Sequence, residues 1–104
     1  MSTLTTHVLD TERGVPVSGM SVHVSVRDGS GWSRLSEAVT DSDGRAGGFG
    51  DLGPGTYRLG FETGAAGNEF YPFVHVVFVV DGSRDHYHVP LLLSGHGYTT
   101  YRGS

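Results

Sequence analysis

The sequence contains no cysteine, so disulfide bonds, thiolate ligands and thiol catalysis are excluded. It has no apolar run long enough to cross a bilayer, the longest being Val76–Val80. The first residues lack the basic and apolar regions of a secretory signal. Cationic residues form no cluster and the net charge is −4, which argues against a surface for nucleic acid or anionic membranes. These absences predict a cytoplasmic protein that binds neither nucleic acid nor membrane.

Glycine and alternating polarity are what the sequence has in quantity. Seventeen glycines without a Gly-X-Y repeat indicate many turns. No stretch shows a sustained helical period, and strand-like segments recur every 8–12 residues between clusters of Gly, Asp and Ser. The length of 104 residues fits a single domain, residues 1–104, without linker or repeat. The sequence therefore predicts an all-β protein, a two-sheet antiparallel β-sandwich of about seven or eight strands.

The predicted strands differ in how polar and apolar residues divide between their faces. In Met20–Arg27 the apolar residues face inward, while the alternate residues, among them His23, face water. Phe73–Val80 is apolar on both faces apart from His75, which is the pattern of a strand covered on both sides. The other predicted strands are Leu4–Leu9, Trp32–Thr40, Thr56–Thr63 and the two runs on either side of the Gly95–Gly97 turn.

The last nineteen residues have an unusual composition. His86 and His88 lie on the same face of an extended segment, because strand side chains alternate with a period of two. The apolar run Val89–Leu93 follows, and beyond the glycine turn aromatic and cationic residues continue to Ser104. Because chain ends are normally frayed, this composition predicts an end that is held in place and used.

Several segments resemble the 5-hydroxyisourate hydrolases, the enzymatic branch of the transthyretin family. The most specific match is at the end of the chain, where His88–Ser94 and Gly97–Ser104 resemble the carboxyl-terminal signature of that branch. The terminal Tyr-Arg-Gly-Ser separates these enzymes from the hormone carrier of the family. Three further matches follow the same order along the chain, at Thr6–Asp10 with Arg13–Pro16, at Thr40–Arg45, and at Pro54–Leu59.

The resemblance implies catalytic roles for His7, Arg45 and His88, three positions at which transthyretin carries other residue types. It implies hydrolysis of 5-hydroxyisourate to 2-oxo-4-hydroxy-4-carboxy-5-ureidoimidazoline in urate degradation, without metal or cofactor. The histidines would activate water, and Arg45 would hold the anionic substrate and the oxyanion. The residues that would line the site are Tyr101, Arg102, Gly103 and Ser104.

The resemblance also implies a homotetramer, a dimer of dimers with the sites at the dimer–dimer interface. Phe73–Val80, apolar on both faces, fits a strand that a partner subunit covers. Two departures from the family pattern stand out. Gly64–Phe70 is shorter than the segment that carries the family's short helix, so that helix is expected to be reduced or absent. His96 adds an imidazole where many members carry a different residue, and we expect it near the site.

Each candidate residue also has a simpler interpretation. Arg45 fits a solvated turn residue paired with Asp41 or Asp43, and such a surface ion pair contributes little. His86 and His88 fit an exposed edge strand, since Pro90 donates no backbone hydrogen bond. What favours catalysis is the joint match to one family pattern.

Other site chemistries and functions stay open. A zinc site could combine His86 and His88 with His7 or His96, although no carboxylate stands at a ligand spacing. A calcium loop beginning at Asp41 lacks the required glutamate at its twelfth position, which is Leu52. Two non-enzymatic alternatives are a transthyretin-like carrier of a small molecule and a structural β-sandwich module.

Overall fold

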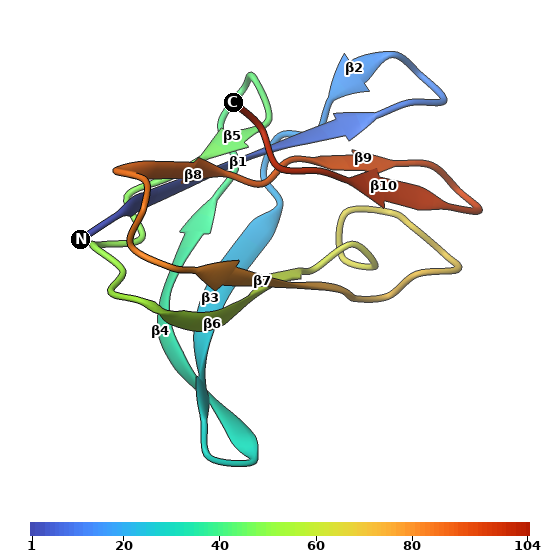
Figure 1. Cartoon of the computed structure of the whole chain (residues 1–104). Coiled ribbons are helices and arrows are strands. Elements are labelled where there is room, and N and C mark those ends of the chain that lie inside the picture. Colours follow the sequence, from blue (N-terminus) through green and yellow to red (C-terminus); the bar gives the residue numbers. More distant parts are fainter.

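The computed structural model describes all 104 residues as two β-sheets packed face to face, which confirms the sandwich (Figure 1). It has ten strands and no helix, and residues 63–67, where the family helix was expected to be reduced or absent, form turns. No helix is present that could cross a membrane. The first sheet contains β1 (Thr3–Asp10), β2 (Val15–Pro16), β5 (Arg45–Ala46), β8 (His86–His88), β9 (Leu91–Leu93) and β10 (Tyr98–Thr100). The second sheet has the order β4 (Gly31–Val39), β3 (Ser21–Asp28), β6 (Gly55–Phe61) and β7 (Val74–Val80).

Strand β1 is the centre of the first sheet. It pairs antiparallel with β2 and β5, and parallel with β8 and β9. The prediction of antiparallel sheets is confirmed for every other strand pair, and these two parallel pairs are the exception. A parallel pair needs a crossover connection, and here the whole second sheet lies between the two strands in the sequence. The result is that the first and last parts of the chain lie side by side.

Alternation along β1 decides which side chains enter the core. Leu4, Thr6 and Val8 are buried between the sheets, whereas Thr5 and His7 lie on the outer face. The hydroxyl of Thr6 donates to the Val89 carbonyl at 2.6 Å, so its burial leaves no unpaired donor. Burying each apolar side chain of this kind stabilises the fold by about 1.5–3 kcal/mol. The packing of these side chains thus fixes the register of β1, and this places Thr5 and His7 on the outer face.

The outer face of β3 is covered, contrary to the prediction that His23 faces water. His23 is only 6% exposed. Gly60 on β6 lies opposite, and a Cβ there would come within 2.1 Å of His23 Cε1, so the imidazole lies over the glycine. The ring of His75 meets it edge-on at 6.5 Å between centroids, and Glu62 Oε2 is 4.0 Å from Nε2. The alternation of polar and apolar residues correctly placed His23 on the outer face of β3. It could not show that residues of other strands cover the ring there.

Acidification is expected to destabilise the fold through His23. Burial, followed by the charge on Arg34, holds the pKa of His23 below its ordinary value of 6.5, against the opposite effect of Glu62. The stability of the neutral form is complete above pH 6.5 and is lost as the pH falls through the lowered pKa of the folded state. The urea midpoint should therefore fall less steeply with acidification in His23→Leu than in the wild type. An equal slope in both proteins would contradict this, and His96→Leu is the control.

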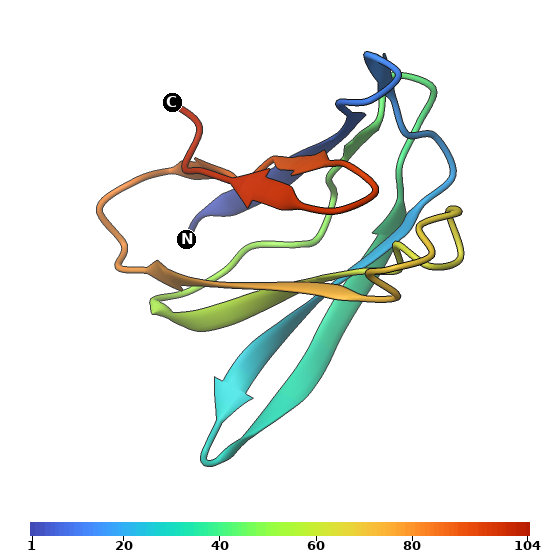
Figure 2. The same cartoon turned by 90° about the vertical axis from the view of Figure 1, so that its right-hand side faces the viewer.

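Strand β7 forms an edge of the second sheet, because it pairs only with β6. Its inner residues Val74, Val76 and Val80 are buried, but Val77 and Val79 on the other face are 55% and 64% exposed. The strand Phe73–Val80 was predicted to be covered on both faces, but within one chain only one face of β7 is covered. Figure 2 shows this edge and the β9–β10 pair above it.

Candidate active site

The structure brings His7, Arg45 and His88 together on the outer face of the first sheet. His7 lies opposite Arg45 in the antiparallel β1–β5 pair, and His88 lies opposite Thr5 in the parallel β1–β8 pair. Thr5 and His7 are two apart on one strand and share the outer face. Neighbours of this kind have Cβ atoms about 5–8 Å apart. Three residues that are far apart in the sequence therefore form one cluster.

A tight turn positions Arg45. Asp41 Oδ1 accepts the backbone N–H groups of Asp43 at 2.9 Å and Arg45 at 3.0 Å, and these bonds, that of Arg45 first, lower the pKa of Asp41. Gly44 adopts φ 77°, and a Cβ there would lie 2.5 Å from the Val8 carbonyl oxygen. Only glycine fits this approach of the turn to β1. The turn thus delivers Arg45 to the position beside His7.

No carboxylate oxygen lies within 4.0 Å of the Arg45 guanidinium, although the charge of Arg45 contributes to the lowered pKa of Asp41. The two ion pairs are Arg13 with Asp10 and His23 with Glu62, so the alternative that Arg45 pairs with Asp41 or Asp43 is wrong. Arg45 instead borders a cavity of about 220 Å³ on the outer face. An unpaired, exposed guanidinium can hold a planar anion with two parallel hydrogen bonds. The residues lining this cavity are Thr5, Thr6, Asp41, Arg45, Ala46 and Gly47.

His7 is oriented by the same turn. Its Nε2 lies 2.8 Å from the Asp43 carbonyl oxygen. Because a carbonyl only accepts, Nε2 carries the proton and donates it. The neutral ring of His7 therefore keeps its lone pair on Nδ1.

His88 is half-buried, and its Nδ1 lies 2.8 Å from the Thr5 hydroxyl. Burial lowers the pKa of His88 below 6.5, and Arg45, His7 and His86 lower it further, while hydrogen bonding to the Thr5 backbone raises it. The imidazole is thus neutral at neutral pH and can accept a proton.

The carboxyl-terminal end divides between two places. It leaves β10 on the side of the first sheet that faces away from the second sheet (Figures 1 and 2). The Gly103 N–H donates to the His88 carbonyl at 2.8 Å, and a Cβ on Gly103 would lie 2.7 Å from His88 Cδ2. Tyr101 and Arg102 instead line a cavity of about 310 Å³ beside β7. Ser104, at the end, is exposed.

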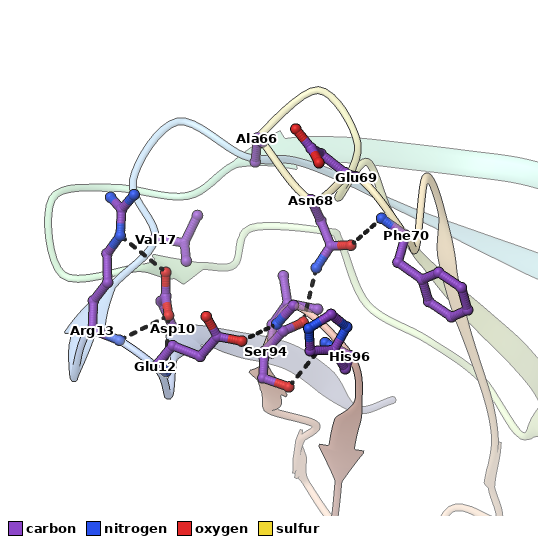
Figure 3. Close-up of a pocket in the computed structure, with 13 residues that line it drawn as sticks. Asp10, Glu12, Arg13, Val17, Ala66, Asn68, Glu69, Phe70, Ser94 and His96 are labelled. Atoms are coloured by element: carbon purple, nitrogen blue, oxygen red, sulfur yellow. Dashed lines mark hydrogen bonds and ion pairs between the residues drawn. The ribbon is translucent and has the colours of Figure 1, made fainter.

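The largest cleft, of about 550 Å³, lies at one end of the sandwich and contains none of the three clustered residues (Figure 3). Asn68 Nδ2 donates to the Ser94 carbonyl at 2.9 Å, and Glu12 accepts the Gly95 N–H at 2.6 Å. These bonds link the loop before β7 and the turn after β1 to the β9–β10 turn. His96 lines this cleft, so the expectation that it lies near His88 is wrong.

Sequence reasoning did not single out Thr5, although alternation placed it on the same face as His7. Its hydroxyl lies between two imidazoles, 2.9 Å from His86 Nε2 and 2.8 Å from His88 Nδ1. Both rings of the His-X-His pair thus turn toward a hydroxyl, and no group of three His, Asp or Glu side chains is arranged to hold a metal ion. Thr5 could not be identified without knowing that β8 pairs with β1.

Comparison with known proteins gives one consistent family. A sequence model described as HIUase/Transthyretin family matches residues 4–103. The 5-hydroxyisourate hydrolase of Caulobacter vibrioides is 48% identical, over 100% of both chains. The uric acid degradation bifunctional protein TTL of Arabidopsis thaliana is 42% identical over 97% of this chain, which spans only 37% of that relative's length.

Solved structures of two kinds resemble the fold almost equally. Klebsiella pneumoniae 5-hydroxyisourate hydrolase has a TM-score of 0.87 and 36% identity, over 100% of both chains. Sea bream transthyretin in complex with thyroxine has a TM-score of 0.89 and 29% identity, over 96% of this chain and 93% of its own. The backbone therefore does not separate a hydrolase from a carrier, and the side chains of the site must do so.

Proposed function

The chain belongs to the HIUase/transthyretin family, and on that premise we propose that it hydrolyses 5-hydroxyisourate in urate degradation. The observation that carries the proposal is the cluster of two imidazoles and an unpaired guanidinium on one outer face. A carrier needs an apolar channel for its ligand, but not these three groups. The relatives named as hydrolases support the same choice.

The reaction adds one water across a ring amide. The water oxygen bonds to the carbonyl carbon of the six-membered ring while a histidine takes one of its protons. The ring C–N bond then breaks, and that proton passes to the departing nitrogen, which leaves a ureido group and a carboxylic acid. The acid releases the second water proton to solvent and becomes the carboxylate. His7 and His88 position and deprotonate the water, and such general-base assistance is worth about 10²–10⁴ in rate.

Arg45 is proposed to act on both the substrate and the transition state. Its planar fork matches the edge of an anionic heterocycle. As water adds, negative charge collects on the carbonyl oxygen, and a preorganised donor at that point stabilises it by about 3–4 kcal/mol. The absence of an internal ion partner for Arg45 supports this role, since no carboxylate has to be displaced first.

We propose that the end of the chain forms the floor of the substrate site. Gly103 packs against His88, and Ser104 follows with a hydroxyl. Tyr101 and Arg102 line the neighbouring cavity, from which they would reach the substrate once a partner subunit closes the site.

A homotetramer, a dimer of dimers, is proposed to complete the site at its dimer–dimer interface. Two observations support this. The catalytic cluster lies on an open sheet face that cannot exclude water by itself, and β7 presents exposed Val77 and Val79 beside an unpaired strand edge. Sedimentation velocity at micromolar concentration is expected to show four chains, and a monomer alone would contradict the assembly.

The test of activity follows the ultraviolet decay of freshly generated 5-hydroxyisourate, with and without the protein, in the presence of a chelator. Acceleration well above spontaneous decay is expected to persist in the chelator. Unchanged decay would exclude the hydrolase, and saturable binding of an aromatic ligand under the same conditions would then favour the carrier.

Gly103→Ala is expected to reduce turnover about 10²-fold with little change in the urea midpoint. The new methyl group would displace either the tail or the His88 ring, and a shift of about 1 Å in a catalytic group costs a factor of that size. Gly97→Ala is the matched control, because a Cβ there would lie an ordinary 3.8 Å from Ser94 Oγ. Equal activity of the two variants would mean that the tail does not contribute to the site.

A further inference from the structure

A chain of hydrogen bonds runs along the outer face between β1 and β8. The parallel register puts Thr3 opposite His86 and Thr5 opposite His88. Thr3 Oγ1 lies 2.6 Å from His86 Nδ1, and Thr5 Oγ1 lies 2.9 Å from His86 Nε2 and 2.8 Å from His88 Nδ1. His86 is thus connected at both ring nitrogens, and Thr5 joins it to His88.

The backbone carbonyl of Asp85 gives this chain a direction. That carbonyl lies 3.4 Å from the Thr3 hydroxyl, and a hydroxyl that donates to it accepts from His86 Nδ1–H at 2.6 Å. In the Nδ1–H tautomer, His86 accepts at Nε2 from the Thr5 hydroxyl. Because Thr5 has spent its only proton, it accepts from His88 Nδ1–H. In this arrangement His88 Nε2 carries a lone pair.

The reverse direction serves catalysis less well. It turns the Thr3 proton away from the Asp85 carbonyl and places the proton of His88 on Nε2, so the nitrogen not bound to Thr5 could no longer accept one. The first arrangement, in which His88 donates from Nδ1 to Thr5, does not have to change during the reaction. When Nε2 takes a proton from water, Nδ1–H still donates to Thr5, and no hydroxyl has to rotate.

We propose that His86, acting through Thr5, is a positioning residue that holds neutral His88 in its Nδ1–H form and so makes Nε2 the base that deprotonates water. This inference rests on the proposed hydrolase function. His86 itself would not touch the substrate. The inference identifies His88 as the base, and Thr5 and His86 as the two groups that orient it.

The groups around His88 explain why a hydroxyl orients it. Arg45 approaches from β5, His7 from β1 and His86 from its own strand. A carboxylate in place of Thr5 would orient the ring equally well, but it would repel an anionic substrate and pair with Arg45. A neutral hydroxyl fixes the tautomer without that cost.

The experiment compares wild type, Thr5→Val, Thr5→Ser and His86→Leu by two readouts. The first is the pair of ¹⁵N chemical shifts of the His88 ring at neutral pH, which report the tautomer without any turnover. The second is kcat and KM for 5-hydroxyisourate. Wild type and Thr5→Ser are expected to hold Nδ1–H, whereas Thr5→Val and His86→Leu gain the Nε2–H form.

The expected kinetic loss in Thr5→Val is about 10- to 100-fold in kcat with KM unchanged, the range found when outer partners of metal-bound histidines are removed. His96→Leu is the control for His86→Leu, since its ring lies in the distant cleft. An Nε2–H form of His88 in the wild type would overturn the proposal, whatever the variants do. So would an unchanged tautomer and kcat in Thr5→Val. An inactive wild type would instead refute the hydrolase function while leaving the tautomer readout intact.

Discussion

Replacement of His88 by glutamine is expected to lower kcat for the ring opening of 5-hydroxyisourate by about 10²- to 10⁴-fold, the range that a general base supplies. Glutamine can still bond to the Thr5 hydroxyl, which now lies 2.8 Å from the imidazole, but it has no nitrogen that takes up a proton. The ring is only half-buried, so the urea midpoint should stay near that of the wild type. Initial rates corrected for spontaneous decay measure the loss.

The pH profile of the wild type tests the same assignment independently. Because burial first, and then Arg45, lowers the pKa of His88, the acid limb of kcat/KM should have its midpoint below pH 6.5. Activity is full above that pKa and falls as the pH drops through it. His96→Gln is the matched control and should keep both the rate and the limb. A His88→Gln variant with wild-type turnover would remove His88 from the mechanism.

Much of the fold could be predicted from local alternation, but its sheet pairing could not. The strands around Leu4–Leu9, Met20–Arg27 and Thr56–Thr63 appear within two residues of the expected bounds, because each divides cleanly into an apolar and a polar face. The parallel pairing of β1 with β8 and β9 depends on contacts across most of the chain, and no local pattern records it. The exposure of His23 failed for a related reason, since its cover comes from Gly60 and His75 on other strands.

The site divides in the same way. Residue types and motif order indicated His7, Arg45 and His88, yet nothing in the sequence says that Thr5 of β1 lies opposite the His-X-His pair. The position of His96 shows the converse, because closeness in sequence to His88 suggested closeness in space. The turn after β9 carries His96 to the end of the sandwich instead. A sequence can thus name the catalytic groups, while their hydrogen-bond partners follow only from the strand pairing.

A loss in both kcat and substrate binding is expected for Arg45→Met. Removing one preorganised oxyanion donor costs about 10²–10³ in kcat, and losing the cation that holds the substrate raises KM as well. The fold should be unaffected, because Asp41 holds the turn through the backbone N–H of residue 45 and not through its side chain. Rates at saturating and at low substrate separate the two losses, and Arg13→Met is the control for removal of a surface guanidinium.

The same variant should also shift the pH profile of kcat/KM. Arg45 is the largest influence on the pKa of His88 after burial, and it lowers that pKa. Without it, the pKa of His88 rises toward 6.5, so the acid limb of kcat/KM shifts to higher pH while the rate falls. Arg45→Lys keeps the charge but not the planar fork, and should lose rate with the limb almost unmoved. A limb that stays in place in Arg45→Met would mean that guanidinium and imidazole do not share one site.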